Sequence, residues 1–203
     1  MYKHKNGISF RKVSISDIEF LYHLKEDTLW GVHETFMKNM EDQKRWIENL
    51  DESKEMFFTI WYEKERFGVF SYTNIDLYHR CCRYSGSGTR KGSKKQLAFN
   101  ALECGIDFAF EILNLNRIEA DIIAYNVPSL KLNLNLGLKI EGTRKKAVYK
   151  SGVYYDSHLV AMLREDWQSS SRIKDYHGSC NLTFNHNLNE KLIQRFQNKI
   201  CFE

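Results

Sequence analysis

A short basic, glycine-rich segment limits the folds open to this chain more than any other feature. Residues 86–96 read GSGTRKGSKKQ and contain no acid. A candidate strand, Arg80–Tyr84, precedes them, and the apolar stripe of a long helix, 94–113, follows. A strand, a glycine loop and a helix start in this order can hold a phosphate group, because the first N–H groups of a helix lack partners. We therefore expect an α/β fold with an anionic ligand at this loop.

The distribution of charge supports an anionic ligand at the same place. The chain has 30 Lys and Arg against 26 Asp and Glu, a net charge of +4. That excess is too small to indicate nucleic-acid binding by itself. Between Arg80 and Lys95, however, there are six basic residues and no acid. An anion is expected to dock there, and a solvated basic loop is the alternative.

Two common phosphate motifs do not fit the loop. A P-loop beginning at Gly86 requires a second glycine five residues later, where the chain has Lys91. The dinucleotide fingerprint also fails, because its third glycine would again fall on Lys91. The ligand is therefore expected to be held by a different phosphate loop.

The apolar patterns predict strands that alternate with helices. Strands are expected at 8–13, 56–62, 66–75, 80–84, 117–125, 139–149 and 153–163, and helices from Asp17 with Ser16 as cap, after Asp42, over 94–113 and over 126–137. Gly105 inside the long helix indicates close packing on a sheet. The run SLKLNLNLGLKI alternates like a strand, but Asn126, Pro128 and Gly137 are typical of the two ends of a helix.

Length and composition indicate one globular domain with a tail. The 203 residues are 42% hydrophobic and 14% aromatic, which is enough for a buried core. We expect a domain over 1–167 and a polar extension over 168–203 with a short amphipathic helix. The chain lacks an apolar run of roughly 18 residues and an apolar signal core. Its five cysteines have no metal-like spacing, so we expect reduced thiols and a cytoplasmic protein.

Several motifs occur in the order of a known family. Thr89–Lys94 is similar to the pyrophosphate loop Q/R-x-x-G-x-G/A, and Asn126–Ser129 matches N-x-x-A/S. Leu136–Leu138 is similar to L-G-F, and Glu141–Gly142 matches E-G. From about Ile8 to Trp167 the chain thus resembles the GNAT superfamily of acetyl-CoA-dependent N-acetyltransferases. The runs DFAFEILNLNRI, EGTRKKAVYKSGVYYDS and REDW resemble two branches, the ribosomal-protein N-terminal acetyltransferases and the enzymes that acetylate nucleotide-linked amino sugars.

The resemblance implies a fold and a cofactor site. The fold is α/β, of the α+β kind, with a mixed and mostly antiparallel sheet of six to seven strands, splayed between strands four and five and flanked by about four helices. The pantetheine arm of acetyl-CoA would pair with the splayed strands, and no metal is expected. The residues implied in cofactor binding are Tyr84, Ser85, Arg90, Lys91, Gly92, Ser93, Lys94, Lys95 and Asn126.

The resemblance also implies roles in catalysis. Glu34, acting through a water molecule, is the expected general base, and Ser129 or a water molecule is expected to protonate the leaving thiolate. His33, Tyr149 and Asp156 are expected to contact the acceptor. Asn133 stands where many relatives carry the Tyr that protonates the thiolate, and Lys94 where the loop has Gly or Ala. Cys81 or Cys82 as a covalent acetyl carrier is the alternative to direct transfer.

Sequence reasoning therefore predicts an N-acetyltransferase that moves acetyl from acetyl-CoA directly to a primary amine. A small or nucleotide-linked amino sugar is the expected acceptor, because Arg144, Lys145, Lys146 and Lys150 would suit an anionic one. A protein N-terminal acetyltransferase and a non-catalytic module that binds acyl-CoA or nucleic acid are the alternatives. We expect a small-molecule partner without membrane or nucleic acid, and a homodimer stays open.

Overall fold

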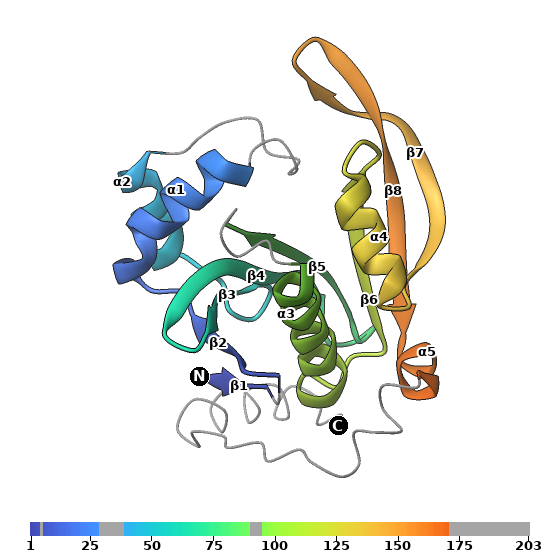
Figure 1. Ribbon diagram of the computed structural model, residues 1–203, viewed down its shortest axis with the longest axis horizontal. Helices are drawn as coiled ribbons and strands as arrows, with labels where there is room; N and C mark the ends of the chain where they lie inside the picture. The colour runs from blue at the N-terminus through green and yellow to red at the C-terminus, as the bar shows by residue number, and fades with distance from the viewer. Residues whose placement is uncertain (5, 29–38, 90–94, 171–203) are drawn as a thin grey trace.

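The structure, a computed structural model, describes residues 1–4, 6–28, 39–89 and 95–170 (Figure 1). The strands are β1 Tyr2–Lys3, β2 Ile8–Lys12, β3 Met56–Tyr62, β4 Glu65–Asp76, β5 Cys81–Gly88, β6 Arg117–Ile123, β7 Lys139–Lys150 and β8 Val153–Leu163. The helices are α1 Ile18–Thr28, α2 Met40–Glu48, α3 Lys95–Asp107, α4 Val127–Asn135 and α5 Arg164–Ser169, with a 3-10 turn at Ile15–Asp17 and a π turn at Phe108–Ile112.

The strands form one sheet in the order β1-β2-β3-β4-β5-β6-β8-β7. Neighbouring strands are antiparallel except β5 and β6, which are parallel. This arrangement confirms the expected fold class. The described sheet has eight strands rather than six or seven, because the two-residue β1 adds to the edge beside β2.

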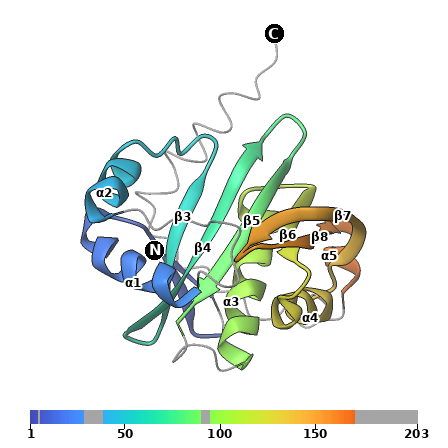
Figure 2. The ribbon, with the colours of Figure 1, turned by 90° about the horizontal axis from the view of Figure 1, so that it is seen from above.

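Helices cover both faces of the sheet (Figure 2). On one face Trp46 of α2 packs against Phe57 of β3, with ring centroids 4.6 Å apart. On the other face α3 lies against β4. A Cβ added to Gly105 would overlap the ring of Phe70, and the hydroxyl of Tyr72 donates a hydrogen bond to the Gly105 carbonyl. The expected reason for a glycine inside this helix is therefore confirmed.

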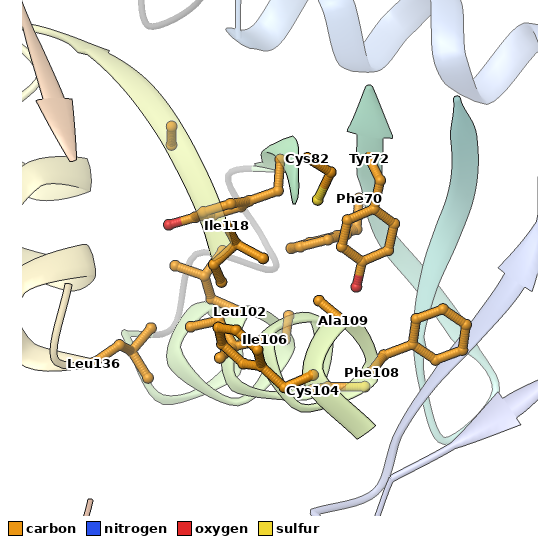
Figure 3. Packing of buried hydrophobic residues seen from close by; sticks show 14 of the residues in the cluster. Phe70, Tyr72, Cys82, Leu102, Cys104, Ile106, Phe108, Ala109, Ile118 and Leu136 are labelled. Carbon is orange, nitrogen blue, oxygen red and sulfur yellow. The ribbon is translucent and has the colours of Figure 1, made fainter. Parts of the chain in front are cut away.

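The core lies between α3 and the sheet (Figure 3). Phe70 and Tyr72 are 1% and 0% exposed, and Cys104 and Ile106 of α3 are equally enclosed. Phe108 extends this cluster, since its ring stacks with that of Tyr72 at a centroid distance of 6.0 Å. Because these buried side chains pack closely, the helix and the strands are held at a fixed spacing.

The segment 126–137 is a helix, as its end signals predicted. The side chain of Asn126 accepts a hydrogen bond from the N–H of Ser129, and Gly137 has a φ of +96°. Leu136 is 1% exposed and faces the core, whereas Leu134 is 38% exposed. Leucines that alternate in the sequence thus lie on a buried side and on an exposed side of this helix.

Several expected boundaries were wrong. Ser14 rather than Ser16 starts the first helical turn, because its N–H donates to the Asp17 carboxylate. The next helix begins at Met40, capped by Asn39. β5 runs on to Gly88, since it stays paired with β4. β6 ends at Ile123, whose carbonyl accepts from the N–H of Asn126 as the chain turns into α4.

A short helix lies at the end of the described residues. The short helix α5 was not expected as an element, yet it brings the Trp167 ring against Phe110 at 5.3 Å. The predicted tail helix lies outside the described residues. None of the helices in the described ranges has the length and apolar character needed to cross a membrane.

Candidate active site

The strands β5 and β6 part soon after they meet. Parallel pairing joins Cys81–Arg83 to Arg117–Glu119, and there the ladder between them ends in the described chain. β5 continues to Gly88 on β4, and β6 continues to Ile123 on β8. Figure 1 shows the two strands diverging toward the loops. The predicted splay therefore lies between β5 and β6, and it leaves strand edges to which an extended ligand can add.

The basic glycine segment leads from the open end of this splay into α3. Its first residues, Gly86–Gly88, belong to β5, and the N–H of Thr89 donates to the carbonyl of Phe67 at 2.8 Å. The backbone is described again from Lys95, the first residue of α3. The expected pyrophosphate contacts Arg90, Lys91, Gly92, Ser93 and Lys94 lie outside the described residues. Ser85, also expected to bind the cofactor, is exposed on β5.

Two further predicted residues lie at the start of α4. Asn126 caps the helix, with its amide oxygen 3.3 Å from the nitrogen of Ser129. Ser129 is half-buried in the first turn. The first N–H groups of such a helix are suited to an anion or a developing negative charge.

A buried hydrogen bond links α4 to β5. Asn133 is only 4% exposed, and its side-chain oxygen accepts from the hydroxyl of Tyr84, which is 5% exposed. The Asn133 amide nitrogen donates to the carbonyl of Ser129 at 2.8 Å. Burial raises the pKa of Tyr84 well above its usual value, so the phenol keeps its proton. Sequence reasoning singled out both residues but did not predict that they pair.

A charged cluster on the opposite face of the sheet was not predicted. The Asp121 carboxylate on β6 is 9% exposed and receives Arg83 of β5 at 2.7 Å. Arg144 of β7 and the hydroxyl of Ser157 on β8 bind the same carboxylate. The alternation of β6 was the available signal, because it places Asp121 on the face opposite Ile118 and Ile122. The cluster ties four strands together beside the point where β5 and β6 part.

The predicted acceptor contacts on the β7–β8 hairpin form a separate set. Tyr149 is 55% exposed near the turn and packs against Tyr154 with ring centroids 4.8 Å apart. Asp156 accepts from the backbone N–H of Lys146 and from Nζ of Lys145, each at 2.9 Å, and these bonds lower its pKa. The structure thus gives Asp156 a role in shaping the hairpin. His33 and Glu34 lie outside the described residues.

Two of the four basic residues that sequence reasoning singled out on the hairpin are paired with carboxylates. Arg144 and Lys145 each bind a carboxylate, on Asp121 and Asp156 respectively. Partial burial lowers the pKa of Lys150. An anionic acceptor would therefore have to compete with carboxylates for Arg144 and Lys145, which weakens the reason for expecting one.

The two adjacent cysteines are poorly suited to carry an acetyl group. Burial raises the pKa of Cys82 well above its usual value, and the neighbouring Cys81 thiol adds to the shift. The pKa of Cys81 is also raised, by desolvation and by Asp76. Because the thiolate is the nucleophile, both groups are weak nucleophiles at neutral pH. The raised pKa of both thiols therefore argues against the alternative of a covalent acetyl carrier.

Comparison with known sequences places these features in one family. The model of the acetyltransferase (GNAT) domain matches residues 14–159. The SPbeta prophage-derived uncharacterized N-acetyltransferase YokL of Bacillus subtilis is 21% identical over 164 residues, which are 80% of this chain and 93% of that protein. The uncharacterized N-acetyltransferase YnaD of B. subtilis is 32% identical over 73 residues, 36% of this chain. That match spans less than half of YnaD, at 43% of its length.

Solved structures share the fold. A chimera of the spermidine N-acetyltransferase SpeG from Vibrio cholerae and hSSAT superposes with a TM-score of 0.76 at 18% identity, covering 81% of this chain and 99% of that one. The V. cholerae spermidine N-acetyltransferase in complex with CoA and spermine gives 0.74 at 18% identity, over 80% and 99% of the two chains. At this identity the likeness shows the architecture alone.

Proposed function

The chain belongs to the acetyltransferase (GNAT) domain family and carries its acetyl-CoA-dependent N-acetyltransferase domain; from that premise we propose that it transfers acetyl directly to the primary amine of a small acceptor. The observation that carries the proposal is the parting of β5 and β6 after three parallel pairs, Cys81–Arg83 with Arg117–Glu119. The next elements after these two strands in the chain are α3 and α4 respectively. Backbone groups for the pantetheine arm and helix starts for negative charge thus occur together.

Direct transfer asks three things of the site. The ammonium of the acceptor must lose a proton, the carbonyl oxygen must be stabilised as it becomes negative, and the CoA sulfur must leave as a thiolate. A backbone N–H of the diverging part of β5 is suited to the oxygen. We assign the region of the leaving sulfur to Ser129, in the first turn of α4. Glu34, with His33 beside it, remains our proposal for the base.

The acceptor is proposed at the level of a small primary amine. The pairing of Arg144 and Lys145 with carboxylates withdraws support from a nucleotide-linked amino sugar. The fold relatives whose titles name spermidine and spermine make a polyamine the first acceptor to test. Peptide N-termini and amino sugars complete the panel. Residues 33 and 34, which would line the acceptor side, lie outside the described residues, so the acceptor is tested across several amine classes.

Calorimetry with acetyl-CoA and release of free CoA thiol with each amine test the proposal. We expect acetyl-CoA to bind without an acceptor, and a polyamine or another small amine to release thiol in proportion to the acetylated product. Glu34→Gln should lower kcat about 100-fold while the affinity for acetyl-CoA stays unchanged, because a general base contributes to proton removal alone. Glu19→Gln, an exposed carboxylate on α1, is the matched control.

Two results would contradict the proposal. Failure of acetyl-CoA to bind removes the acetyltransferase assignment for this chain. Tight binding without turnover of any amine favours a module that only binds acyl-CoA. Full activity of Glu34→Gln leaves the reaction intact but removes Glu34 as the base.

A further inference from the structure

The orientation of the Asn133 side-chain amide is decided by its partners. The carbonyl of Ser129 can only accept a hydrogen bond, so the amide nitrogen of Asn133 must face it, at 2.8 Å. The amide oxygen then faces the Tyr84 hydroxyl, which donates to it. Because the buried phenol keeps its proton, this donor stays available over the physiological pH range. Tyr84 and Asn133 thus hold one amide orientation.

This orientation also determines what the Ser129 hydroxyl can do. The Asn133 amide nitrogen lies 3.5 Å from Ser129 Oγ, and it can only donate. The hydroxyl oxygen therefore acts as acceptor on this side, and its own proton is directed to a different group. Of the three residues, Tyr84 and Asn133 are buried and Ser129 is half-buried. The hydroxyl proton that Asn133 cannot accept is therefore on Ser129, which is the least buried of these three residues.

The position of this chain of hydrogen bonds in the fold points to its target. Tyr84 directly follows Arg83, the last residue of β5 in the parallel ladder with β6. The contacts from Tyr84 through Asn133 to Ser129 therefore join β5 to the first turn of α4 where β5 leaves β6. A pantetheine arm that enters between these strands passes beside them.

We propose that Tyr84 and Asn133 are positioning residues that aim the Ser129 hydroxyl as a hydrogen-bond donor at the sulfur of CoA. This role rests on the proposed function. As the amine nitrogen forms a bond to the carbonyl carbon of the thioester, the carbon–sulfur bond breaks and sulfur leaves with the electron pair, while a proton of the amine goes to the base. Ser129 keeps its proton, because an alkoxide is a far stronger base than a thiolate. The side-chain amide of Asn133 thus acts on the thiolate through Ser129, at the position where many relatives carry a Tyr that protonates the thiolate.

Calorimetry with CoA and with desulfo-CoA, in which hydrogen replaces the thiol, measures this hydrogen bond without an acceptor amine. At about pH 9, where much of the thiol is ionised, the unaltered protein should bind CoA about tenfold more tightly than desulfo-CoA. Ser129→Ala and Asn133→Leu should each reduce that preference to about twofold or less. Ser129→Thr, which retains a hydroxyl, should preserve it, and Tyr84→Phe should leave an intermediate preference.

The double variant separates positioning from a structural role. If Asn133 acts through Ser129, Asn133→Leu in the Ser129→Ala background causes no further loss of preference. The kcat of amine acetylation should follow the same pattern, with about a tenfold loss for either single variant and no larger loss for the double. Tyr72→Phe is the matched control, because it also removes a buried phenol hydroxyl from the core, but one that donates to Gly105. The Tyr72→Phe variant should keep the preference for CoA over desulfo-CoA.

Each alternative outcome has a distinct meaning. Equal weakening of both ligands by Asn133→Leu, or equal affinity of the unaltered protein for CoA and desulfo-CoA, overturns the positioning role and leaves the proposed function standing. Failure of both ligands to bind the unaltered protein overturns the proposed function and the positioning role together.

Discussion

Cys82 and Cys104 show how burial changes the chemistry of a residue. They are 2% and 0% exposed and face the aromatic core. Desolvation is the largest cause of the raised pKa of each thiol. Since neither thiol ionises at neutral pH, both behave as small apolar side chains rather than as nucleophiles.

These thiols should make stability depend on alkaline pH. Below the ordinary thiol pKa of about 8.5, the folded and unfolded states are both protonated, so the thiols contribute no pH dependence. Above it the unfolded chain loses protons that the folded chain keeps, and the free energy of unfolding should fall by about 1.4 kcal/mol per pH unit for each thiol. Urea unfolding between pH 8 and 9.5 measures the slope. Cys82→Ala should reduce the slope by the contribution of one thiol, with that of Cys104 remaining, and an unchanged slope would show that Cys82 ionises while folded.

At the scale of elements, the contact between α3 and β4 sets the spacing of the main layers. Gly105 lets the helix approach Phe70 and brings its carbonyl to the Tyr72 hydroxyl. In an exposed helix, Gly→Ala is stabilising by about 1 kcal/mol. Here the added methyl group would overlap a fully buried ring, so the sign of the effect is reversed.

Gly105→Ala should therefore lower the free energy of unfolding by about 2 kcal/mol, because α3 or the Phe70 ring must shift. The midpoint of chemical denaturation measures this change. Gly142→Ala on β7 is the control, since a Cβ there meets no atom within 4 Å. A neutral or stabilising Gly105→Ala would mean that the helix and sheet can separate without cost.

For the whole molecule, one buried carboxylate joins three distant parts of the chain. Asp107 at the end of α3 lies 3.2 Å from Nε2 of His4 and accepts from Nε1 of Trp167 at 2.8 Å. His4 and Asp107 are each 6% exposed. The N-terminal edge of the sheet, the central helix and α5 are thus held by contacts to the same side chain.

Asp107→Ala should lower the free energy of unfolding by about 3 kcal/mol, because it leaves a buried imidazole and a buried indole N–H without their partner. Circular dichroism during urea unfolding is the measurement. Glu52→Ala removes the exposed ion pair with Lys12 and should change stability by less than about 1 kcal/mol. Similar effects of the two variants would contradict the role of Asp107 in joining these elements.

Local patterns predicted most elements but few of their contacts. The end signals Asn126, Pro128 and Gly137 correctly favoured a helix over 126–137, because capping depends on neighbours in the chain. Ser14 and Ser16 could not be separated in this way, because the choice depends on where Asp17 points. The same distinction holds for the site. The motif correctly put Asn126 and Ser129 at the start of a helix, whereas the partners of Tyr84 and Asp121 come from elements far along the chain.

The sequence by itself determined the order of strands and helices, the basic glycine segment before the central helix and the resemblance to an acetyltransferase family. These features depend on periodicity, turn chemistry and short motifs, which are local. Only the tertiary structure decided that Asn133 turns inward to Tyr84, that Asp121 binds Arg83 and Arg144, and that Gly105 meets Phe70. Such contacts depend on burial and on the register between distant strands, because the packing of neighbouring elements selects which polar group finds which partner.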